Sequence, residues 1–173
     1  MIDRFAHHLR LDQIRDGERL DLAADEAERA AICSRLGLEA VDRLDAHATL
    51  SRDGHVVRAE GRLAASLTQS CVITRDRVAA HIDEPFELLF MPAPVTGGPD
   101  DEIELGPQDC DVVFYDGGVI DLGGAIADTL ALSVDPYPRS AGADAALKEA
   151  GLLSEDQASP FAVLAKLRKS DET

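Results

Sequence analysis

Three residues of this sequence have side chains that could bind a metal ion together. Cys71, Cys110 and His81 could supply thiolate and imidazole ligands, which are the groups that zinc prefers. Structural zinc sites are built from closely spaced pairs such as C-x-x-C or H-x-x-x-H, and the sequence contains neither. The two cysteines fall at inward positions of expected strands, where cysteine usually acts as a small apolar residue. We therefore expect no metal ion and no cofactor.

Clusters of carboxylates offer a second kind of chemistry. Asp109 and Asp111, and the run of Asp100, Asp101 and Glu102, could hold Mg²⁺ or Ca²⁺. Neither group has the EF-hand pattern, in which Asp, Asn and Gly fall at fixed positions of one loop. We interpret them as solvated acidic residues. A hydrolase or metal-dependent enzyme with its site in the acidic loop over residues 91–111 is kept as the alternative.

Motifs for nucleophilic catalysis and phosphate binding are missing from the sequence. Cys33 or Cys71 with a histidine is a pairing that any chain of this length offers by chance, and neither G-x-S-x-G nor H-E-x-x-H occurs. Gly117-Gly118 and Gly123-Gly124 lie near the start of an expected helix, but the P-loop and dinucleotide-binding patterns are absent. We interpret these glycines as turn and close-packing residues. The sequence thus predicts a protein that is not an enzyme and has no catalytic residue.

The net charge of -16 is concentrated in the middle of the sequence. Residues 78–138 contain 13 acidic residues and no lysine or arginine, whereas residues 1–77 nearly balance 12 arginines against 14 acids. An acidic face attracts cationic partners and disfavours direct binding of a nucleic-acid backbone by that face. Solubility alone also explains such a surface. We expect Asp100, Asp101 and Glu102 to form an acidic docking surface for a cationic protein.

A strand, a turn and a capped helix follow one another between Phe114 and Arg139, and the other elements must pack around them. Gly117-Gly118 predicts the turn, and Asp121 stands where a helix N-cap belongs. The helix ends before Asp135-Pro136, because the residue before a proline avoids the α region. Its apolar stripe repeats at helical spacing and consists of Leu122, Ile126 and Leu130.

Alternation of apolar and polar residues predicts the strands. The longest run of this kind follows an Asp53-Gly54 hairpin turn. Pro85 implies an edge position or a bulge in a later strand, and Cys110, Val112 and Phe114 are the expected inward side of the last one. We predict strands over 5–14, 44–50, 56–70, 77–90 and 110–115, and helices over 24–36, 121–134, 145–150 and 161–169.

These elements predict an α+β fold, in which a curved antiparallel β-sheet or partial barrel is covered by two or three helices. We expect one such domain over residues 1–139 and a helical C-terminal extension over 140–173, packed on the domain or trailing from it. The first ten residues lack the apolar core of a signal peptide, and no apolar run is long enough to span a membrane. The odd number of widely spaced cysteines favours reduced thiols. We therefore expect a cytoplasmic protein with no membrane association.

Several short motifs follow one another in a characteristic order. The alternating strand that contains Gly61-Arg62-Leu63 precedes Ser70-Cys71-Val72-Ile73-Thr74-Arg75, and an acidic strand finishes in Phe90-Met91-Pro92. Ile120-Asp121-Leu122, Asp128-Thr129-Leu130 and Asp135-Pro136-Tyr137-Pro138 come next. Over residues 10–168 this order resembles the YceD family, the large ribosomal RNA subunit accumulation proteins of bacteria and plastids.

The resemblance identifies family-motif positions as candidate interaction residues. Typical members carry C-x-x-C in the middle; Cys71 matches the first cysteine of this motif, and Thr74 replaces the second. Asp128 stands where a glutamate is usual. The change at Thr74 argues against a metal or redox role in this protein. The full set of motif residues is Cys71, Asp121, Asp128, Asp135, Pro136, Tyr137 and Pro138.

The family is linked to the accumulation of large-subunit ribosomal RNA and has no established catalytic residues. The resemblance therefore implies a non-enzymatic ribosome biogenesis factor. The charge distribution adds the expectation that this factor acts through an acidic protein-binding face. The implied partner is a ribosomal protein or an assembly factor of the large subunit, and whether the protein also contacts RNA is left open. A non-ribosomal adaptor protein is the third interpretation.

Overall fold

The computed structural model describes residues 5–93 and 111–151 and divides the chain into two compact units. The first, which we call the sheet unit, consists of Met1–Gln69 and Ala79–Pro136. The second, the C-terminal unit, consists of Ser70–Val78 and Tyr137–Thr173. The predicted domain boundary near residue 139 stays a prediction. The predicted helix over 161–169 lies outside the described residues.

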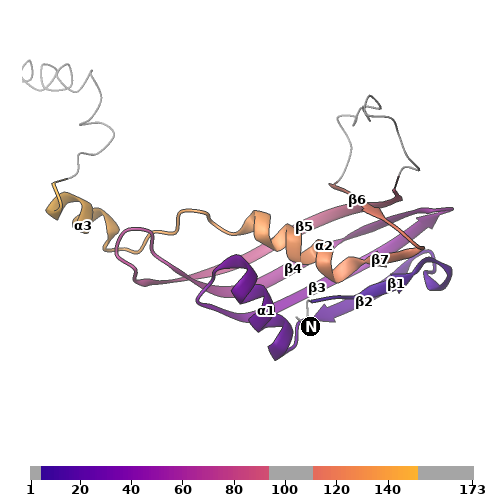
Figure 1. The fold of residues 1–173 in the computed structure, drawn as a ribbon, viewed down its shortest axis with the longest axis horizontal. Helices are drawn as coiled ribbons and strands as arrows, with labels where there is room; N and C mark the ends of the chain where they lie inside the picture. Colours follow the sequence, from indigo (N-terminus) through magenta and orange to yellow (C-terminus); the bar gives the residue numbers. More distant parts are fainter. Residues whose placement is uncertain (1–4, 94–110, 152–173) are drawn as a thin grey trace, which may run out of the picture. The chain divides into compact units, whose positions relative to one another are not determined.

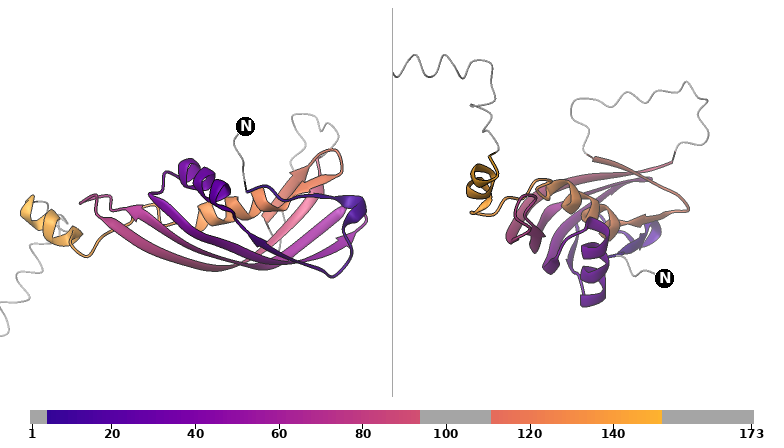
Figure 2. Two further views of the ribbon diagram at one scale, coloured as in Figure 1. Left: turned by 90° about the horizontal axis from the view of Figure 1, so that it is seen from below. Right: turned by 60° about the vertical axis from the view of Figure 1, so that its left-hand side comes forward.

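Five strands form the main sheet, in the spatial order β2-β3-β4-β5-β6 (Figure 1). The neighbours β2, β3 and β4 pair antiparallel. The sheet is strongly curved and does not close into a barrel (Figure 2). The predicted α+β class with a curved sheet is therefore confirmed. The strands are β2 (Glu18–Ala23), β3 (Ala40–Asp53), β4 (Val56–Ser70), β5 (Arg77–Pro92) and β6 (Asp111–Tyr115).

The β3–β4 hairpin forms where the sequence predicts it. Gly54 has a φ of 59°, a left-handed conformation that glycine adopts without a Cβ clash. The inward residues of β4 are buried against the core as the alternation predicts. At Gly61 the neighbouring strand comes so close that an added Cβ would lie 1.9 Å from the His47 carbonyl oxygen and 2.8 Å from the Phe86 ring. This glycine therefore permits the close approach of β3 and of the Phe86 side chain.

The predicted strand over 5–14 is wrong in its length and in the sheet to which it belongs. This part of the chain forms β1 (His8–Arg10) and a 3₁₀ turn, and β2 follows as a strand that the prediction did not contain. β1 pairs with β7 (Val119–Asp121) in a separate two-stranded sheet, with Leu9 opposite Ile120. Ile120 is fully buried. Packing against the core decides which strand pairs with so short a segment. The alternation of apolar and polar residues within the segment carries little information about that packing.

β6 differs from its prediction in direction and in the side chains that it buries. It runs parallel to β5, with Leu88 opposite Asp111, whereas the prediction is antiparallel. A parallel pair needs a connection of about a dozen or more residues, and residues 93–110 supply that length. Tyr115 is buried and donates a hydrogen bond from its hydroxyl to the His55 carbonyl, while Phe114 is exposed. The predicted inward side is therefore wrong by one residue.

The position of β6 also accounts for Pro85 in the middle of β5. The pairing of β6 with β5 begins at Leu88. Within the described residues, β5 therefore has a neighbour at Pro85 on the β4 side alone. This is the edge position that a residue without a backbone N–H tolerates, as the sequence predicts.

Helix α1 (Glu26–Leu36) and helix α2 (Leu122–Ser133) cover the same face of the curved sheet (Figure 2). α1 begins with a capping box, in which Asp25 accepts a hydrogen bond from the Glu28 amide and the Glu28 carboxylate accepts one from the Asp25 amide, both at 2.8 Å. Ile32 is its buried residue. The prediction of this helix is confirmed. Among the helices of residues 5–93 and 111–151, none has the length and apolar character that crossing a membrane requires.

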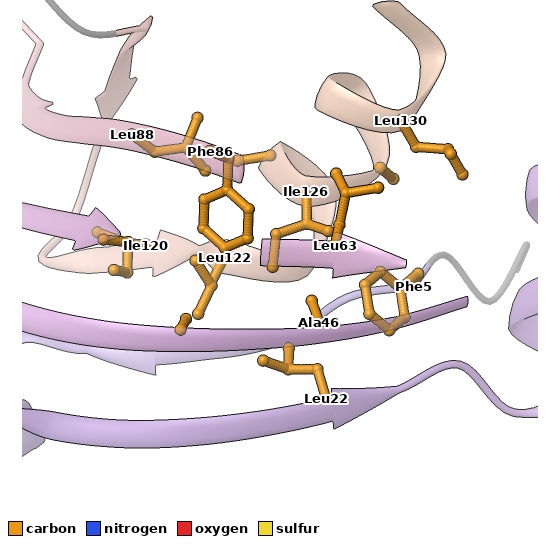
Figure 3. Close-up of a cluster of buried hydrophobic side chains, with 14 of the residues drawn as sticks. Phe5, Leu22, Ala46, Leu63, Phe86, Leu88, Ile120, Leu122, Ile126 and Leu130 are labelled. Atoms are coloured by element: carbon orange, nitrogen blue, oxygen red, sulfur yellow. The ribbon is translucent and has the colours of Figure 1, made fainter. Parts of the chain in front are cut away.

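The apolar stripe of α2 forms the centre of the core, as predicted. Leu122, Ile126 and Leu130 are fully buried, and Figure 3 shows Leu122 and Ile126 beside Phe86 and Leu63 of the sheet. Gly123 allows the helix to approach the N-terminal segment, because a Cβ there would lie 2.6 Å from the Phe5 carbonyl oxygen. In the C-terminal unit, α3 (Ala143–Glu149) is the short helix expected near 145–150.

Candidate functional site

Two of the motif residues are located at helix α2 and have structural partners there. Asp121 is the N-cap of the helix, and Asp128 lies in its middle. Asp121 Oδ1 accepts a hydrogen bond from the Gly124 amide at 2.9 Å and lies 4.0 Å from His8 Nδ1. Asp128 is exposed and forms an ion pair with Arg35 of α1. Asp121 therefore begins the helix, and Asp128 links it to its neighbour. The sequence could indicate the first role, because capping is local, but not the second.

A groove of about 530 Å³ lies between α1 and α2. Most of its lining is apolar, and Arg35, Asp121 and Asp128 are its charged residues. Arg35 and Asp128 form an ion pair with each other, and Asp121 caps α2. The groove can therefore hold an apolar side chain of a ligand or partner. Its apolar lining residues are Phe5, Ala31, Ile32, Val113, Ala125 and Ala127.

Arginines from outside the acidic segment 78–138 neutralise part of its charge. Arg58 and Arg62 of β4 pair with Glu87 and Asp83 of β5 across the sheet, in addition to the ion pair between α1 and α2. Each exposed pair stabilises the fold by only about 0.2–1 kcal/mol, so the main effect is on surface charge. The acidic face is therefore less continuous than the sequence indicates. Spacing along the chain cannot show pairs that form between strands.

Part of the remaining acidic charge lies on the edge strand β6. Asp111 and Asp116 are exposed at its two ends, and Phe114 between them is 48% exposed. An edge strand with an acid at each end and an exposed aromatic ring can contact a cationic, partly apolar segment of another protein. The predicted docking residues Asp100, Asp101 and Glu102 lie outside the described residues, as do Asp109 and Cys110.

Cys71 is fully buried in the C-terminal unit and accepts hydrogen bonds from two backbone amides. The Thr74 amide lies 3.4 Å and the Ser140 amide 3.2 Å from Sγ. Burial raises the pKa of the Cys71 thiol, but the hydrogen bonds from Thr74 and Ser140 outweigh this effect and lower the pKa to about 6. The sulfur is therefore a hydrogen-bond acceptor that joins two segments far apart in the sequence.

Thr74, Asp76 and Ser140 complete the polar cluster around Cys71. Thr74 Oγ1 donates a hydrogen bond to Asp76 Oδ2 at 2.6 Å, and Ser140 Oγ donates one to the same oxygen at 3.1 Å. Asp76 and Ser140 were not among the predicted site residues. The sequence feature that could have indicated this cluster is the threonine at position 74, where typical family members have a cysteine. A hydroxyl in this place can donate to a carboxylate.

The zinc ligands considered from the sequence do not gather in the part of the chain that the structure describes. His81 Nδ1 lies 3.1 Å from Ser66 Oγ, and Cys110 lies outside the described residues. Across residues 5–93 and 111–151, no three side chains of His, Cys, Asp or Glu lie together as a metal site would require. The prediction that the protein carries no metal ion stays a prediction.

Two backbone carbonyls of the motif Asp135-Pro136-Tyr137-Pro138 accept hydrogen bonds. In the sheet unit, the Asp135 carbonyl accepts a hydrogen bond from Gln69 Nε2 at 2.7 Å. In the C-terminal unit, the Pro138 carbonyl accepts one from the Val72 amide at 3.0 Å. Pro138 is buried, whereas the Asp135, Pro136 and Tyr137 side chains are exposed. The segment therefore positions exposed side chains on a fixed backbone.

Comparison with protein families gives a match for this chain. A family model described as large ribosomal RNA subunit accumulation protein YceD matches residues 59–168, which is more than half of the chain. The matched range begins within β4 and includes the Cys71 turn, the edge strand β6 and helix α2. No curated protein and no solved structure matches the chain.

Proposed function

The chain belongs to the YceD family of large ribosomal RNA subunit accumulation proteins, and from this premise we propose that it acts as a non-enzymatic factor. In this proposal the protein supports the accumulation and maturation of large-subunit ribosomal RNA. It does so by binding a cationic ribosomal protein, or a cationic assembly factor, of the large subunit. Its place of action is the cytoplasm, where ribosomes of bacteria are assembled.

The observation that carries this mechanism is the chemistry of the edge strand β6. Phe114 presents an aromatic ring that is 48% exposed, and Asp111 and Asp116 are exposed on either side of it. Exposed aromatic residues are enriched among the residues that dominate protein–protein binding. The flanking carboxylates add electrostatic attraction for a basic partner, which speeds association. Together they support a protein-binding role for the acidic segment.

The ion pairs of the sheet restrict where that partner can bind. Glu87 and Asp83 are already paired with Arg58 and Arg62, so a cationic partner would have to replace these contacts in order to use them. Asp111 and Asp116 are outside these pairs. The proposal therefore places the docking surface at the β6 edge, and Asp100, Asp101 and Glu102 precede this strand in the sequence.

Sedimentation of a cell lysate tests the process. We expect the protein to travel with precursors of the large subunit, and we expect a deletion strain to contain less large-subunit than small-subunit ribosomal RNA. A deletion strain with a normal ratio of the two RNAs, together with protein that sediments as free chain, would contradict the proposed function. The non-ribosomal adaptor would then be the better interpretation.

Variants of the edge strand test the mechanism, with large-subunit precursor particles from the same lysate as the probe. Phe114→Ala should weaken binding about tenfold, because exposed aromatic residues at the centre of an interface typically contribute more than about 1 kcal/mol. Leu132→Ala is the matched control, since Leu132 is 81% exposed on α2, and it should bind like the unmodified protein.

Charge reversal completes this test. Asp111→Lys with Asp116→Lys should slow association and reduce its dependence on salt. Reversal of Asp100, Asp101 and Glu102 to lysine measures the contribution of the loop in the same way. If all of these variants bind the particles like the unmodified protein, the acidic segment serves solubility, and the protein-binding mechanism is wrong.

A further inference from the structure

The C-terminal unit carries a surface whose chemistry is the opposite of that of the acidic segment. An aromatic ring, two aliphatic side chains and three arginines are exposed on two short stretches of chain. We call this surface the Tyr137 patch. It consists of Val72, Ile73, Arg75, Arg77, Tyr137 and Arg139.

Hydrogen bonds hold the two stretches of the patch side by side. The Val72 amide donates to the Pro138 carbonyl at 3.0 Å, so Tyr137 and Arg139 flank the residue that pairs with Val72. The Cys71 amide donates to the Asp76 carbonyl at 2.8 Å, which closes the turn that carries Ile73 and Arg75. The patch is therefore built on a fixed backbone, and the exposure of its side chains does not depend on a loose loop.

The turn of the patch contains the one non-glycine residue in the described chain with a positive φ. Arg75 has a φ of 66°, a conformation that is uncommon for residues with a Cβ. Its amide donates to the Cys71 carbonyl at 3.0 Å, which holds the conformation in place. Asparagine or glycine would adopt this φ with less strain. An arginine at this position is instead held outward at the tip of the turn, where its charge is exposed.

The local charge of the C-terminal unit is positive where its described residues are exposed. Residues 70–78 and 137–151 contain four basic side chains and three acidic ones. One of the acids, Asp76, accepts hydrogen bonds from Thr74 and Ser140. Another, Asp144, lies 3.5 Å from Arg139, so these two charges offset each other and the excess positive charge of the patch is small. In contrast, residues 78–138 contain no basic residue. The patch is thus a small cationic surface on an otherwise acidic protein.

We propose that the Tyr137 patch binds single-stranded RNA, with an unpaired base stacked on Tyr137 and the arginines in contact with the neighbouring phosphates. Proteins recognise unpaired RNA by stacking bases on aromatic rings and guanidinium planes, and phosphate contacts supply the position. Tyr137 is 73% exposed, so its ring is accessible to a base. This inference rests on the proposed function and deepens it, since it adds a direct RNA contact to the protein contact at β6.

The net charge of the whole chain does not prevent this contact. At physiological salt, exposed charges that are more than about 8 Å apart are largely screened from each other. A phosphate at the patch therefore responds mainly to the charges nearest to it, which are those of Arg75, Arg77 and Arg139 together with Asp76 and Asp144. The contact is local, and we expect it to be of low affinity and to depend strongly on the aromatic ring.

Binding of labelled RNA to the full-length protein tests the proposal. The probe is a fluorescent oligouridine of about twelve nucleotides, which is long enough for one binding site, and binding is followed by anisotropy. Tyr137→Ala should lower the affinity roughly 5- to 100-fold, the range expected for loss of one stacked base. Tyr137→Phe keeps the ring and should retain the affinity. A duplex of the same length should bind more weakly, because its bases are already stacked.

The arginines provide an independent measurement. Arg75→Gln, Arg77→Gln and Arg139→Gln together should reduce the slope of log affinity against log salt by about 2, which is the value for roughly three phosphate contacts on a single strand. Arg19→Gln is the matched control, because Arg19 is exposed on β2 of the sheet unit. Thermal melting of each variant verifies that it is folded, because substitutions of exposed residues usually change stability very little.

RNA affinity that is the same for Tyr137→Ala as for the unmodified protein would overturn the proposal. If this variant also no longer sediments with large-subunit precursors, the patch is a protein contact. Failure of this proposal and failure of the proposed function give different results. A chain that binds RNA through Tyr137 in a strain with a normal ratio of ribosomal RNAs would contradict that function and leave the RNA contact established.

Discussion

The described residues of the sheet unit and those of the C-terminal unit make different kinds of internal contact. In the sheet unit, α1 and α2 bury a continuous apolar cluster against the concave face of the sheet, with Leu122, Ile126 and Leu130 at its centre. In the C-terminal unit, the buried residues Cys71 and Ala143 are not part of that cluster. The described contacts there are hydrogen bonds to a sulfur atom, a carboxylate and backbone carbonyls.

This difference shows how one small protein can combine stability with an exposed binding surface. The apolar cluster supplies free energy of folding in proportion to the area that it buries, and it leaves polar residues for the outer surface. Val72 and Tyr137 remain exposed in the same unit as the buried Cys71 sulfur. Hydrogen bonds fix the geometry of the second unit, and their strength depends on the protonation of the groups involved.

Ile126→Ala is the largest expected perturbation of the sheet unit. The side chain is fully buried, and its truncation leaves a cavity that costs about 2–5 kcal/mol, a large part of the stability of a typical domain. Chemical denaturation should show this loss, and Leu132→Ala on the exposed side of the same helix should be unchanged. A loss below about 0.5 kcal/mol for Ile126→Ala would show that α2 is not essential to the core.

Cys71→Ala should destabilise the C-terminal unit by about 1–3 kcal/mol, because it leaves the partly buried amides of Thr74 and Ser140 without this acceptor. Amide hydrogen exchange is the suitable measurement, since it reports on local opening. We expect faster exchange at Thr74 and Ser140 with no change at Ile126. Equal acceleration at all three amides would mean that the two units unfold together, and the comparison between them would fail.

The pH dependence of the same thiol sharpens the comparison. The pKa of Cys71 is lowered from 9.0 to about 6 by its hydrogen bonds. Its stabilising contribution is therefore fully present above about pH 9, decreases as the pH falls, and is lost below about pH 6. Protection factors at Thr74 and Ser140 should rise from about pH 6 to about pH 8 in the unmodified protein. In Cys71→Ser they should stay constant, and a rise in this variant would assign the effect to another group.

Asp121→Ala should cost the sheet unit about 1 kcal/mol, because the Gly124 amide loses its cap. The matched change is Asp25→Ala, which removes the cap of α1. Thermal melting of the two variants compares the helices directly. If Asp121→Ala lowered the free energy of unfolding as much as Ile126→Ala does, the cap would position the whole helix and not only accept the hydrogen bond of the Gly124 amide.

The smallest effect is expected for the ion pair between Arg35 and Asp128. Both side chains are largely exposed, so a double-mutant cycle of Arg35→Ala and Asp128→Ala should give a coupling of about 0.2–1 kcal/mol that decreases with added salt. A coupling well above this range, or one that salt does not change, would mean that the pair is important for the packing of α1 on α2.

Local signals in the sequence determined most of the secondary structure. The caps Asp25 and Asp121, the Asp53-Gly54 turn and the alternation in β4 act over a few residues, so their physical effects can be read from neighbouring positions. The apolar stripe of α2 is equally local, and each of its residues is buried as predicted. Length and pattern together were sufficient for the α+β class and the curved sheet.

Only the tertiary structure decided which segments meet. The parallel partner of β6, the pairing of β1 with β7, the arginines that neutralise Asp83 and Glu87, and the approach of Ser140 to Cys71 all join residues far apart in the chain. Such contacts depend on loop closure and on the packing of the whole core, which no local pattern encodes. The same reason explains the candidate sites: the sequence contains their residue types, but the fold brings these residues together.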